Sequence, residues 1–538
     1  MNLKSEQTNQ KLRGGYYTPK KLTDYLTSWI FEGDKNGISI FEPSAGDGAF
    51  LKSILNRTNS CKVTAVEIDA GEYKKAQALV SKDKRFDIAN QDFFDFYEKN
   101  QNTYHAIIGN PPYIRYQFLE QQQRITQSDI LEKNGMKANR LINSWVAFTV
   151  ATVELLKPSG KLAFVLPTDI LQVTYARQLR EFLFKELSEI TLITFEVSPF
   201  ENIQQDIVLL MGVKKRASLE VSKFRVINLK SMQHLKSCYN EKYYTVEGKK
   251  DKKWTRYLLG YKQTEAIENL YKSKDCIALN DIAKVEVGIT TGKNELFCVT
   301  EALIEKYDLS NFKRPLLGRS INSHGIVYGK NDLYKNIKSK KKAWLLDFNS
   351  DVRENFSKGA INYLSLIEQK GLNSGYKLGI RNEWYNVPSI WIPDAFMLRR
   401  IGSFPKLILN KIGAVSTDTF HRMKFNHHVD EHWIIFSLYS SIGLLSFELA
   451  GRSFGGGALE ILPGDIDEIL VPKKLDSSLD SIKLFLTLDD LFRKNTDILE
   501  IISFVDTVLI NQGTVSAKEI EKYRNIYFHL LKRRLKKK

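Results

Sequence analysis

The chain has 538 residues, with 79 Lys and Arg against 62 Asp and Glu, so its formal net charge at pH 7 is +17. Hydrophobic residues make up 43% of the sequence, which is enough for packed cores and excludes a mainly disordered chain. No apolar run approaches the roughly 18 residues of a membrane-spanning helix, and the polar N-terminus shows no secretory signal. The basic excess favours a polyanionic partner.

Cysteine and histidine usage gives no sign of a metal site. The four cysteines are spread along the chain, at Cys61, Cys238, Cys276 and Cys298. They form no Cys-x-x-Cys pair, which is typical of a protein in a reducing cytosol. The most closely spaced histidines are His421, His427, His428 and His432. Because no Cys or acid stands at ligand spacing around them, we expect no bound metal, and we expect a cytoplasmic protein.

The first 215 residues alternate between two kinds of pattern. Apolar runs typical of strands lie at 38–41, 63–68, 106–108, 161–166, 190–196 and 207–213, and helical patterns lie at 49–55, 143–156 and 176–187. Strands interleaved with helices indicate an α/β sheet with helices on both faces. Ligands of such sheets bind at the carboxyl ends of the strands, where Glu42, Glu67 and Asn110 stand.

After residue 215 the alternation fades, and Lys, Arg, Tyr and Trp become frequent. We expect a catalytic domain over 1–215 and a linker over 216–280. Short apolar runs separated by Gly, Pro and Asn turns predict a mixed, β-rich domain over 281–474. A helical, basic C-terminal region follows over 475–538.

A glycine turn follows the first predicted strand, where residues 41–50 read Phe-Glu-Pro-Ser-Ala-Gly-Asp-Gly-Ala-Phe. Gly46 and Gly48 permit a close backbone approach and positive φ. The turn has neither the GxGxxG pattern nor the phosphate-loop pattern, and its acids Glu42 and Asp47 would repel a pyrophosphate. An acidic glycine turn instead suits a cationic ligand, such as the amino-acid moiety and sulfonium of S-adenosylmethionine.

Two further acids follow in an order that suits the rest of such a cofactor. Glu67 ends the second strand, where an acid is placed to accept hydrogen bonds from ribose hydroxyls. Asp92 suits an adenine amino group and has the aromatic Phe93 beside it. The acidic glycine turn, followed in order by Glu67 and Asp92, predicts an S-adenosylmethionine site.

The third strand leads into Asn110-Pro111-Pro112-Tyr113. The side-chain oxygen of Asn110 and the carbonyl of Pro111 could both accept hydrogen bonds from one exocyclic amino group, and the prolines bring no competing amide donor. Two acceptors favour a more pyramidal nitrogen whose lone pair points at the methyl group. Tyr113 supplies a ring that can stack on a flat base. Positioning and electrostatics would carry the reaction without a metal or a covalent intermediate.

These residues resemble the amino-methylating, S-adenosylmethionine-dependent nucleic-acid methyltransferases, whose catalytic motif is (Asp/Asn/Ser)-Pro-Pro-(Tyr/Phe/Trp). The sequence is most similar to the gamma class of N6-adenine DNA methyltransferases of type II restriction–modification systems, the TaqI-like group. The resemblance implies a Rossmann-like class I methyltransferase domain followed by a DNA-recognition domain. It also implies a site-specific, adenine-specific DNA methyltransferase (EC 2.1.1.72) that modifies a flipped-out adenine.

The motifs of this family fall in order along residues 13–215. Residues 15–19 match motif X, 41–48 motif I, 66–69 motif II, 92–93 motif III, 110–113 motif IV, 161–167 motif VI and 198–202 motif VIII. The resemblance places cofactor contacts at Tyr17, Thr18, Glu42, Ser44, Ala45, Gly46, Glu67, Ile68, Asp92, Phe93 and Asn110. It places catalytic contacts at Asn110, Pro111, Pro112, Tyr113 and Phe200.

Phe200 is the motif VIII aromatic, so Tyr113 and Phe200 would sandwich the extruded adenine. Only about 90 residues separate Asn110 from Phe200, too few for a separate recognition domain. Sequence recognition is therefore expected after residue 215, and this motif order is the one that defines the gamma class.

The C-terminal half resembles the TaqI-like specificity domain. Residues 287–294, Val-Gly-Ile-Thr-Thr-Gly-Lys-Asn, look like its entry segment, and 454–460 and 469–472 look like its closing segments. The candidate DNA contacts are basic: Arg314, Arg319, Lys377, Arg381, Arg399, Arg400, Lys411, Arg422 and Lys424. The resemblance implies double-stranded DNA as partner, a separately encoded cognate restriction endonuclease or none, no membrane, and a monomer.

Three alternatives share parts of this pattern. Glutamine-methylating enzymes of release factors and guanine-amino rRNA methyltransferases resemble residues 41–113, but they lack the upstream Gly-Tyr-Tyr-Thr-Pro and a large basic C-terminal domain. A non-enzymatic DNA-binding subunit is opposed by the intact residues 110–113. A modification subunit of a multi-subunit restriction or phage-exclusion complex is the third alternative, and the integral specificity domain favours a self-sufficient enzyme over it.

Overall fold

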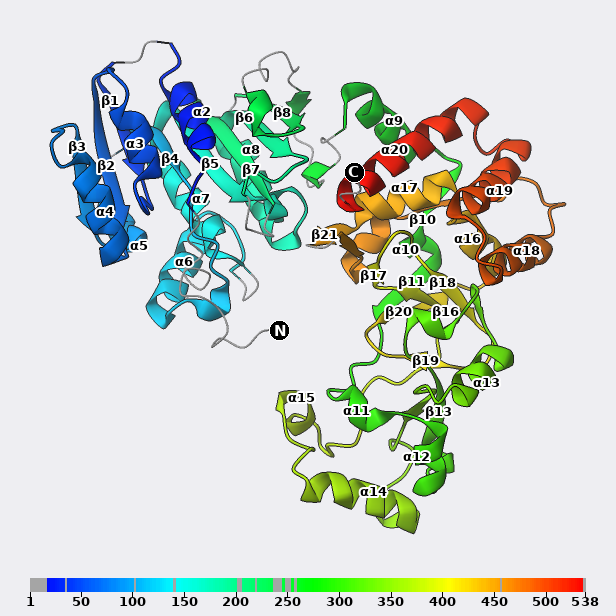
Figure 1. The fold of residues 1–538 in the computed structure, drawn as a ribbon. Coiled ribbons are helices and arrows are strands. Elements are labelled where there is room, and N and C mark those ends of the chain that lie inside the picture. The colour runs from blue at the N-terminus through cyan, green and yellow to red at the C-terminus, as the bar shows by residue number, and fades with distance from the viewer. Residues whose placement is uncertain are drawn as a thin grey trace. The chain divides into compact units, whose positions relative to one another are not determined.

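A computed structural model describes residues 17–33, 36–100, 103–138, 142–200, 206–217, 220–235, 244–246, 253–255, 259–454 and 457–535. The chain divides into two compact units, Met1–Gly260 and Tyr261–Lys538. Their elements are labelled in Figure 1, and each unit is described by itself.

The first unit is built on a nine-stranded sheet with the strand order β3-β2-β1-β4-β5-β7-β6-β8-β9. Its strands are β1 Ile38–Glu42, β2 Cys61–Glu67, β3 Phe86–Asn90, β4 Tyr104–Gly109, β5 Leu156–Pro167, β6 Leu187–Phe195, β7 Ile207–Lys214, β8 Ser222–Leu229 and β9 Tyr244–Val246. The first five strands pair in parallel, and β7 runs antiparallel between β5 and β6. The predicted α/β sheet is thus confirmed.

Helices cover both faces of this sheet. They are α2 Lys20–Ile30, α3 Ala49–Leu55, α4 Ala70–Val80, α5 Phe93–Lys99, α6 Gln121–Lys133, α7 Ser144–Glu154 and α8 Arg177–Glu186. Successive residues of a strand point to opposite faces, so Phe41 packs with side chains of α5–α8 while Ile40 packs with those of α2–α4. The central strands are therefore buried on both sides, which explains their continuous apolar runs.

The described part of the range 216–280 differs from the expected linker. β8 pairs in parallel with β6 and extends the sheet. Trp254, 1% exposed, packs its ring against Phe184 and Phe224 at centroid distances of 5.4 and 4.9 Å. The first unit consequently reaches Gly260, beyond the boundary expected at residue 215.

The second unit combines short strands and helices. Its sheets have the orders β11-β20-β16-β18-β14, β12-β15-β13-β19, β17-β22-β21 and β10-β23. The strands are β10 Cys276–Ala278, β11 Ala283–Val287, β12 Cys298–Val299, β13 Lys313–Leu317, β14 Val327–Tyr328, β15 Trp344–Leu346, β16 Ala395–Leu398, β17 Arg400–Ile401, β18 Leu407–Asn410, β19 Val415–Ser416, β20 Phe420–Phe425, β21 Arg452–Phe454, β22 Ala458–Glu460 and β23 Leu470–Pro472.

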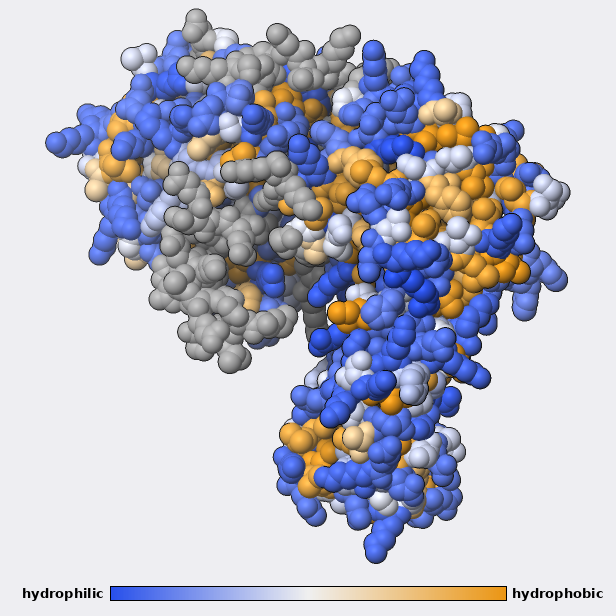
Figure 2. Space-filling model, turned by 45° about the vertical axis from the view of Figure 1, so that its right-hand side comes forward, coloured by the Kyte–Doolittle hydropathy of each residue, from blue (hydrophilic) through white to orange (hydrophobic). Residues whose placement is uncertain are grey.

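Most helices of this unit lie at its two ends in Figure 1. The helices are α9 Tyr261–Lys272, α10 Leu279–Ile282, α11 Asn294–Phe297, α12 Glu301–Lys306, α13 Lys330–Lys338, α14 Lys358–Gln369, α15 Tyr376–Gly379, α16 Glu431–Ser437, α17 Ser441–Ala450, α18 Ser481–Arg493, α19 Ile498–Asn511 and α20 Ala517–Leu535. Helices α16–α20 lie at one end, and α11, α12, α14 and α15 form a lobe at the other, while α10 and α13 lie between them beside the strands. Figure 2 shows apolar residues both over the α16–α19 end and on this lobe.

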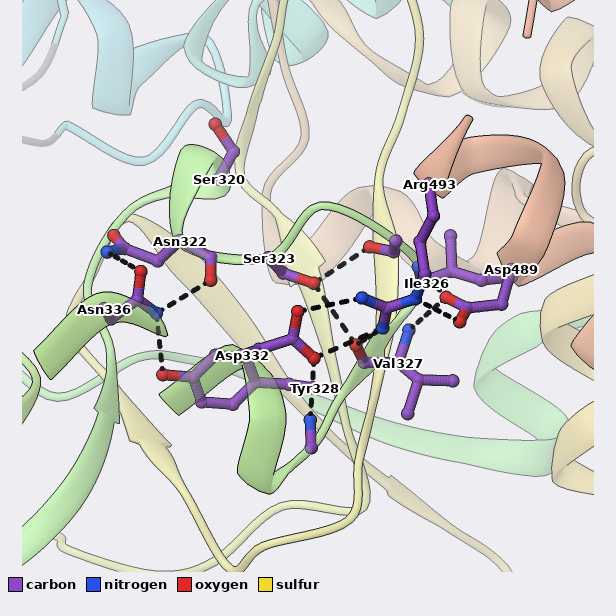
Figure 3. Close-up of polar contacts among 12 residues, drawn as sticks. Ser320, Asn322, Ser323, Ile326, Val327, Tyr328, Asp332, Asn336, Asp489 and Arg493 are labelled. Carbon is purple, nitrogen blue, oxygen red and sulfur yellow. Dashed lines mark hydrogen bonds and ion pairs between the residues drawn. The ribbon is translucent and has the colours of Figure 1, made fainter. Parts of the chain in front are cut away.

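A buried polar network ties the C-terminal helices to the β-rich part of the second unit (Figure 3). Arg493 of α18 donates to Asp489 at 2.6 Å and to Asp332 of α13 at 3.0 Å. Asp489 in turn accepts hydrogen bonds from the backbone amides of Ile326 and Val327 at 2.7 and 3.0 Å. The helical region is therefore an integral part of the second unit.

Among the described residues, no single helix is long and apolar enough to cross a membrane. Helices α16 and α17 reach that threshold only as a pair, and they are bent by 77° at their junction. Their apolar side chains lie in the core of the second unit.

Candidate active site

The turn between β1 and α3 brings the backbone close to neighbouring elements. Gly46 and Gly48 have φ values of 55° and 83°. A Cβ on Gly48 would lie 2.9 Å from Cδ1 of Leu79 and 3.2 Å from the Cα of Ala76, so a side chain there would have to displace Leu79 and the backbone of α4. The predicted need for glycine in this turn thus has a steric cause at Gly48 and a conformational cause at both positions.

Glu67 ends β2 and holds this turn from the adjacent strand. Its carboxylate accepts hydrogen bonds from the backbone N–H of Gly46 and of Asp69, both at 2.8 Å. Burial raises the pKa of Glu67, and these two amide bonds partly offset that rise. Each carboxylate oxygen retains a further lone pair, so Glu67 can still accept a hydrogen bond from a ribose hydroxyl.

Glu42 ends β1 on the parallel neighbouring strand and is 1% exposed. Its Oε2 has no hydrogen-bond partner among the described residues. Burial raises the pKa of Glu42 well above its ordinary value, and the nearby carboxylates of Glu67 and Asp47 raise it further. A buried carboxyl oxygen without a partner is unusual in a folded protein, and a cationic ligand such as S-adenosylmethionine would satisfy it.

The remaining acid and its neighbours have mixed roles. Asp92 caps α5, accepting from the backbone N–H of Phe94 at 2.7 Å, and it also accepts from Gln123 Nε2 at 3.2 Å. Ile68 leaves its apolar side chain 60% exposed at the end of β2, open to an adenine ring. Phe93 differs from the expectation, because it is 3% exposed and stacks on Phe148 inside the core.

Motif X reaches the catalytic motif through Thr18. Tyr17 is 49% exposed and donates its hydroxyl to Glu72 at 3.1 Å. Thr18 is nearly buried, and its Oγ1 accepts a hydrogen bond from Nδ2 of Asn110 at 3.3 Å. Gly15 and Tyr16 lie outside the described residues.

The side-chain amide of Asn110 is oriented at both ends. Its Nδ2 donates to Thr18, and its Oδ1 accepts the hydroxyl of Tyr113 at 3.0 Å. The same hydroxyl lies 3.1 Å from the carbonyl oxygen of Val165 on the adjacent strand β5. Ser44, in the motif I turn, donates to the backbone carbonyl of Asn110 at 3.2 Å. These contacts fix the orientation of the side-chain amide, so that its oxygen and its nitrogen each occupy a defined position.

Sequence reasoning missed Ser144, which holds the motif IV loop from the start of α7. Its Oγ donates to the carbonyl of Pro112 at 2.8 Å and accepts from the N–H of Ile114 at 3.3 Å. Ser144 is buried and stands more than thirty positions from the motif along the chain. No local pattern connects it to the site, although a Ser at the start of a helix is a common signal for a capping hydrogen bond.

Phe200 lies in a packed position. It is 8% exposed and belongs to the cluster on the α2–α4 face of the sheet, whereas Tyr113 packs against the cluster on the α5–α8 face. A base sandwiched between the two rings would therefore require Phe200 to leave its packed position. Glu201 and Asn202, the rest of motif VIII, lie outside the described part of the chain.

A pocket of about 400 Å³ opens beside the motif I turn, between α2, α3 and α4. Its lining includes Thr18 of the predicted site and Asp47 of the glycine turn, but not Glu42, Glu67 or Asn110. In the described parts of the chain, no group of three or more His, Cys, Asp or Glu side chains could hold a metal ion.

Both halves of the chain match models of known protein families. Residues 42–200 match the family model of the Eco57I restriction-modification methylase, and residues 251–510 match that of the C-terminal domain of the type II methyltransferase M.Eco57I. Type II methyltransferase M.AccI of Acinetobacter calcoaceticus is 22% identical over 527 residues, which cover 92% of this chain and 93% of that protein.

Two further likenesses agree with these matches. Type II methyltransferase M.HincII of Haemophilus influenzae is 29% identical over 226 residues, which cover 42% of this chain and 41% of that protein. The structure of the type IIL restriction-modification enzyme MmeI in complex with DNA covers 98% of this chain and 80% of that chain, with a TM-score of 0.56 and 13% identity. This last likeness concerns the fold.

The fold and the site define a class I S-adenosylmethionine-dependent methyltransferase. The matches of its two halves identify the chain as a DNA methyltransferase of a restriction–modification system. DNA is accordingly its substrate, and S-adenosylmethionine is its methyl donor.

Proposed function

We propose that this enzyme methylates the exocyclic N6 amino group of an adenine flipped out of duplex DNA, as a gamma-class modification enzyme. The observation that carries the proposal is the amide of Asn110, oriented at both ends and followed by the carbonyl of Pro111. Two neighbouring acceptors suit an amino group with two N–H bonds, which adenine N6 offers.

The hydroxyl of Tyr113 supports this role, because it has one proton and two acceptors within reach. Asn110 Oδ1 lies at 3.0 Å and the carbonyl of Val165 at 3.1 Å. When the target amine donates to Asn110, the tyrosine proton can remain bonded to Val165. The ring of Tyr113 then stays in place to stack on the base, and no buried donor is left unpaired.

The chemistry needs little else from the chain. When bound, S-adenosylmethionine supplies an electrophilic methyl group. Asn110 and Pro111 would hold the amine so that its lone pair faces that group; the new N–C bond would replace the methyl–sulfur bond, and the amine proton would then leave to solvent. The contribution of the protein is orientation and charge stabilisation.

We assign the cofactor contacts to the acids at the strand ends. Glu67 would accept from the ribose hydroxyls and Asp92 from the adenine amino group. Glu42 would face the positively charged methionine end, which its unpartnered Oε2 supports. Tyr17, Thr18, Ser44, Ala45, Gly46 and Ile68 complete the set, whereas the core position of Phe93 supports only a backbone contact.

The second unit would read the DNA sequence, and we propose a cytoplasmic monomer whose restriction endonuclease, where one exists, is a separate chain. The test is expression in a methylation-free host, followed by single-molecule sequencing and mass spectrometry of the DNA. N6-methyladenine at one short sequence motif is expected, and Asn110→Ala should leave that motif unmodified. Modification of cytosine, or labelled methyl transfer to RNA or protein instead of duplex DNA, would overturn the proposal.

A further inference from the structure

The nine basic side chains expected at DNA are not equivalent in the structure. Six form ion pairs: Arg314 with Asp347, Arg399 and Arg400 with Glu460, Lys411 with Glu431, Lys424 with Asp394, and Arg422 with Glu286. A seventh, Arg381, donates to the backbone carbonyls of Thr290, Thr291 and Trp384. The other two, Arg319 and Lys377, are exposed, and neither forms an ion pair within the described parts of the chain.

Lys377 stands on an unusual exposed loop, residues 370–383, which we name the α15 loop. Next to it, Tyr376 is 84% exposed, and Ile380 is 67% exposed. Neighbouring large apolar side chains left in water indicate a surface that a partner covers. The loop carries Lys370, Lys377 and Arg381 against one acid, Glu383, so that partner is expected to be negatively charged.

The α15 loop is held firmly from inside. Arg381 donates to the carbonyl oxygens of Thr291 at 2.8 Å and Trp384 at 3.1 Å, and its guanidinium lies over the ring of Phe297. Such a guanidinium fixes the backbone of two segments at once. The exposed side chains therefore stand on a rigid base, which lowers the entropy that binding would cost.

Residues 288–292, which read Gly-Ile-Thr-Thr-Gly, pack closely against their neighbours because of their two glycines. Gly292 has φ 81°, and a Cβ there would lie 3.1 Å from Cδ2 of Leu378 and 3.3 Å from the Cβ of Lys377. A Cβ on Gly288 would overlap the carbonyl oxygen of Thr417. Both glycines therefore permit close packing, Gly288 against β20 and Gly292 against α15, so the segment acts as a platform for the α15 loop.

We propose that the α15 loop is a DNA-contacting surface of the second unit, in which Lys377 neutralises a phosphate while Tyr376 and Ile380 pack on sugars or base edges. This assignment rests on the proposed function, which makes duplex DNA the substrate. An exposed cation beside exposed apolar side chains suits duplex DNA, because phosphates and sugars receive most contacts and apolar side chains can contact base edges in the grooves. Arg381 acts as a positioning residue.

The test compares two Tyr-Lys pairs of the same unit. Tyr376 and Lys377 lie on the α15 loop, while Tyr334 and Lys335 are both exposed on α13 and serve as the matched control. Fluorescence anisotropy measures the Kd for a duplex that carries the recognition site, over a series of salt concentrations. Cofactor affinity and the thermal midpoint establish that each variant is folded.

Each α15 variant has its own expected signature. Lys377→Ala should weaken binding to all duplexes and lower the slope of log affinity against log salt by about one. Tyr376→Ala should weaken binding by roughly 5- to 30-fold, as expected for the loss of an aromatic interface contact, and Tyr376→Phe should restore most of it. Arg381→Ala should weaken binding at an unchanged salt slope, because Arg381 touches no phosphate. Tyr334→Ala/Lys335→Ala should bind as the unaltered protein does.

Two results would overturn the assignment. One is an unchanged DNA affinity of Tyr376→Ala/Lys377→Ala, which would point to a protein as the occupant of the loop. The other is an equal loss of affinity in the α13 control. Failure of the proposed function is a separate result, since methylation of a base other than adenine would refute that function while leaving the binding losses intact.

Discussion

At the scale of the residue, the amide of Asn110 is the group on which methyl transfer is expected to depend. Asn110→Ala removes one of the two acceptors for the target amine. We expect the single-turnover rate to fall on the order of 10²-fold or more, with cofactor and DNA affinity largely kept. Thr18→Val is the control, because it leaves the amide oxygen and removes only the acceptor for Nδ2, so its loss should be much smaller. A near-normal rate in Asn110→Ala would contradict the assigned role.

Glu42 is the second residue whose environment yields a prediction. Its pKa is raised by burial and by Glu67 and Asp47, so the folded protein holds its proton at pH values where the unfolded chain has lost it. Stability of the free protein should then decrease as pH rises from the ordinary carboxyl pKa to the raised one. A bound cation favours the ionised form, so cofactor binding should release a proton and strengthen as pH rises.

Calorimetry in buffers of different ionisation enthalpy measures that proton release. Glu42→Gln should abolish the release and weaken cofactor binding, and it should also raise the thermal midpoint of the cofactor-free protein at neutral pH. Glu98→Gln, at an exposed position of α5, serves as the control and should keep the proton release. If Glu42→Gln and the unaltered protein release the same number of protons, another group accounts for them.

At the scale of the element, the turn between β1 and α3 separates two effects of glycine. Gly48→Ala meets Leu79 and Ala76 at a positive φ, whereas a Cβ on Gly46 would meet nothing within 4 Å. Gly46→Ala should therefore lower the free energy of unfolding only by the cost of placing a residue with a Cβ in the left-handed region, roughly 1–2 kcal/mol. Gly48→Ala should lower the free energy of unfolding by more than that, because the added Cβ also overlaps Leu79 and Ala76. It should also shift α3 and weaken cofactor binding. Urea unfolding and cofactor titration measure both, and equal costs would contradict the steric argument.

The elements that could be predicted from the sequence are those buried on both faces. The strands β1, β2, β4 and β5 carry continuous apolar runs that end at Pro, Gly or an acid, and the motifs at their ends located the site. The edge strand β3 was missed because its side chains are only partly buried. β8 was missed because Ser222–Leu229 mixes buried and partly exposed positions, and one-sided burial gives a weaker pattern.

The residues of the site also fall into two groups, those that local sequence patterns identify and those that only the folded chain brings together. Asn110, Glu42 and Glu67 could be named because strand ends and motif order place them together. Ser144 and the carbonyl of Val165 could not, since their contacts with residues 112–114 are made only after the chain has folded. Phe93 follows a cofactor acid in the sequence, but its ring completes the aromatic core with Phe41 and Phe148.

At the scale of the whole molecule, the boundary between the units determines which fragment can fold. A fragment that ends at residue 215 lacks β8, which pairs with β6 from Glu189 to Phe195, and it lacks the buried ring of Trp254. We expect fragment 1–260 to melt cooperatively and to bind S-adenosylmethionine, with little site-specific methylation. Fragment 1–215 should aggregate or melt without cooperativity. Circular dichroism and cofactor titration compare them, and equal behaviour would place the boundary at 215 after all.

The way in which the α15 loop is fastened has a consequence for engineering and for divergence among related enzymes. Lys293 donates to the carbonyl of Leu372 at 2.7 Å, and Arg381 donates to that of Thr291 at 2.8 Å. Leu372 and Arg381, near the two ends of the α15 loop, are thus both hydrogen-bonded to residues 291–293. The exposed positions among residues 373–380, which exclude the buried Leu378, can then be exchanged, so that new side chains alter what the surface recognises while the scaffold beneath it keeps its shape.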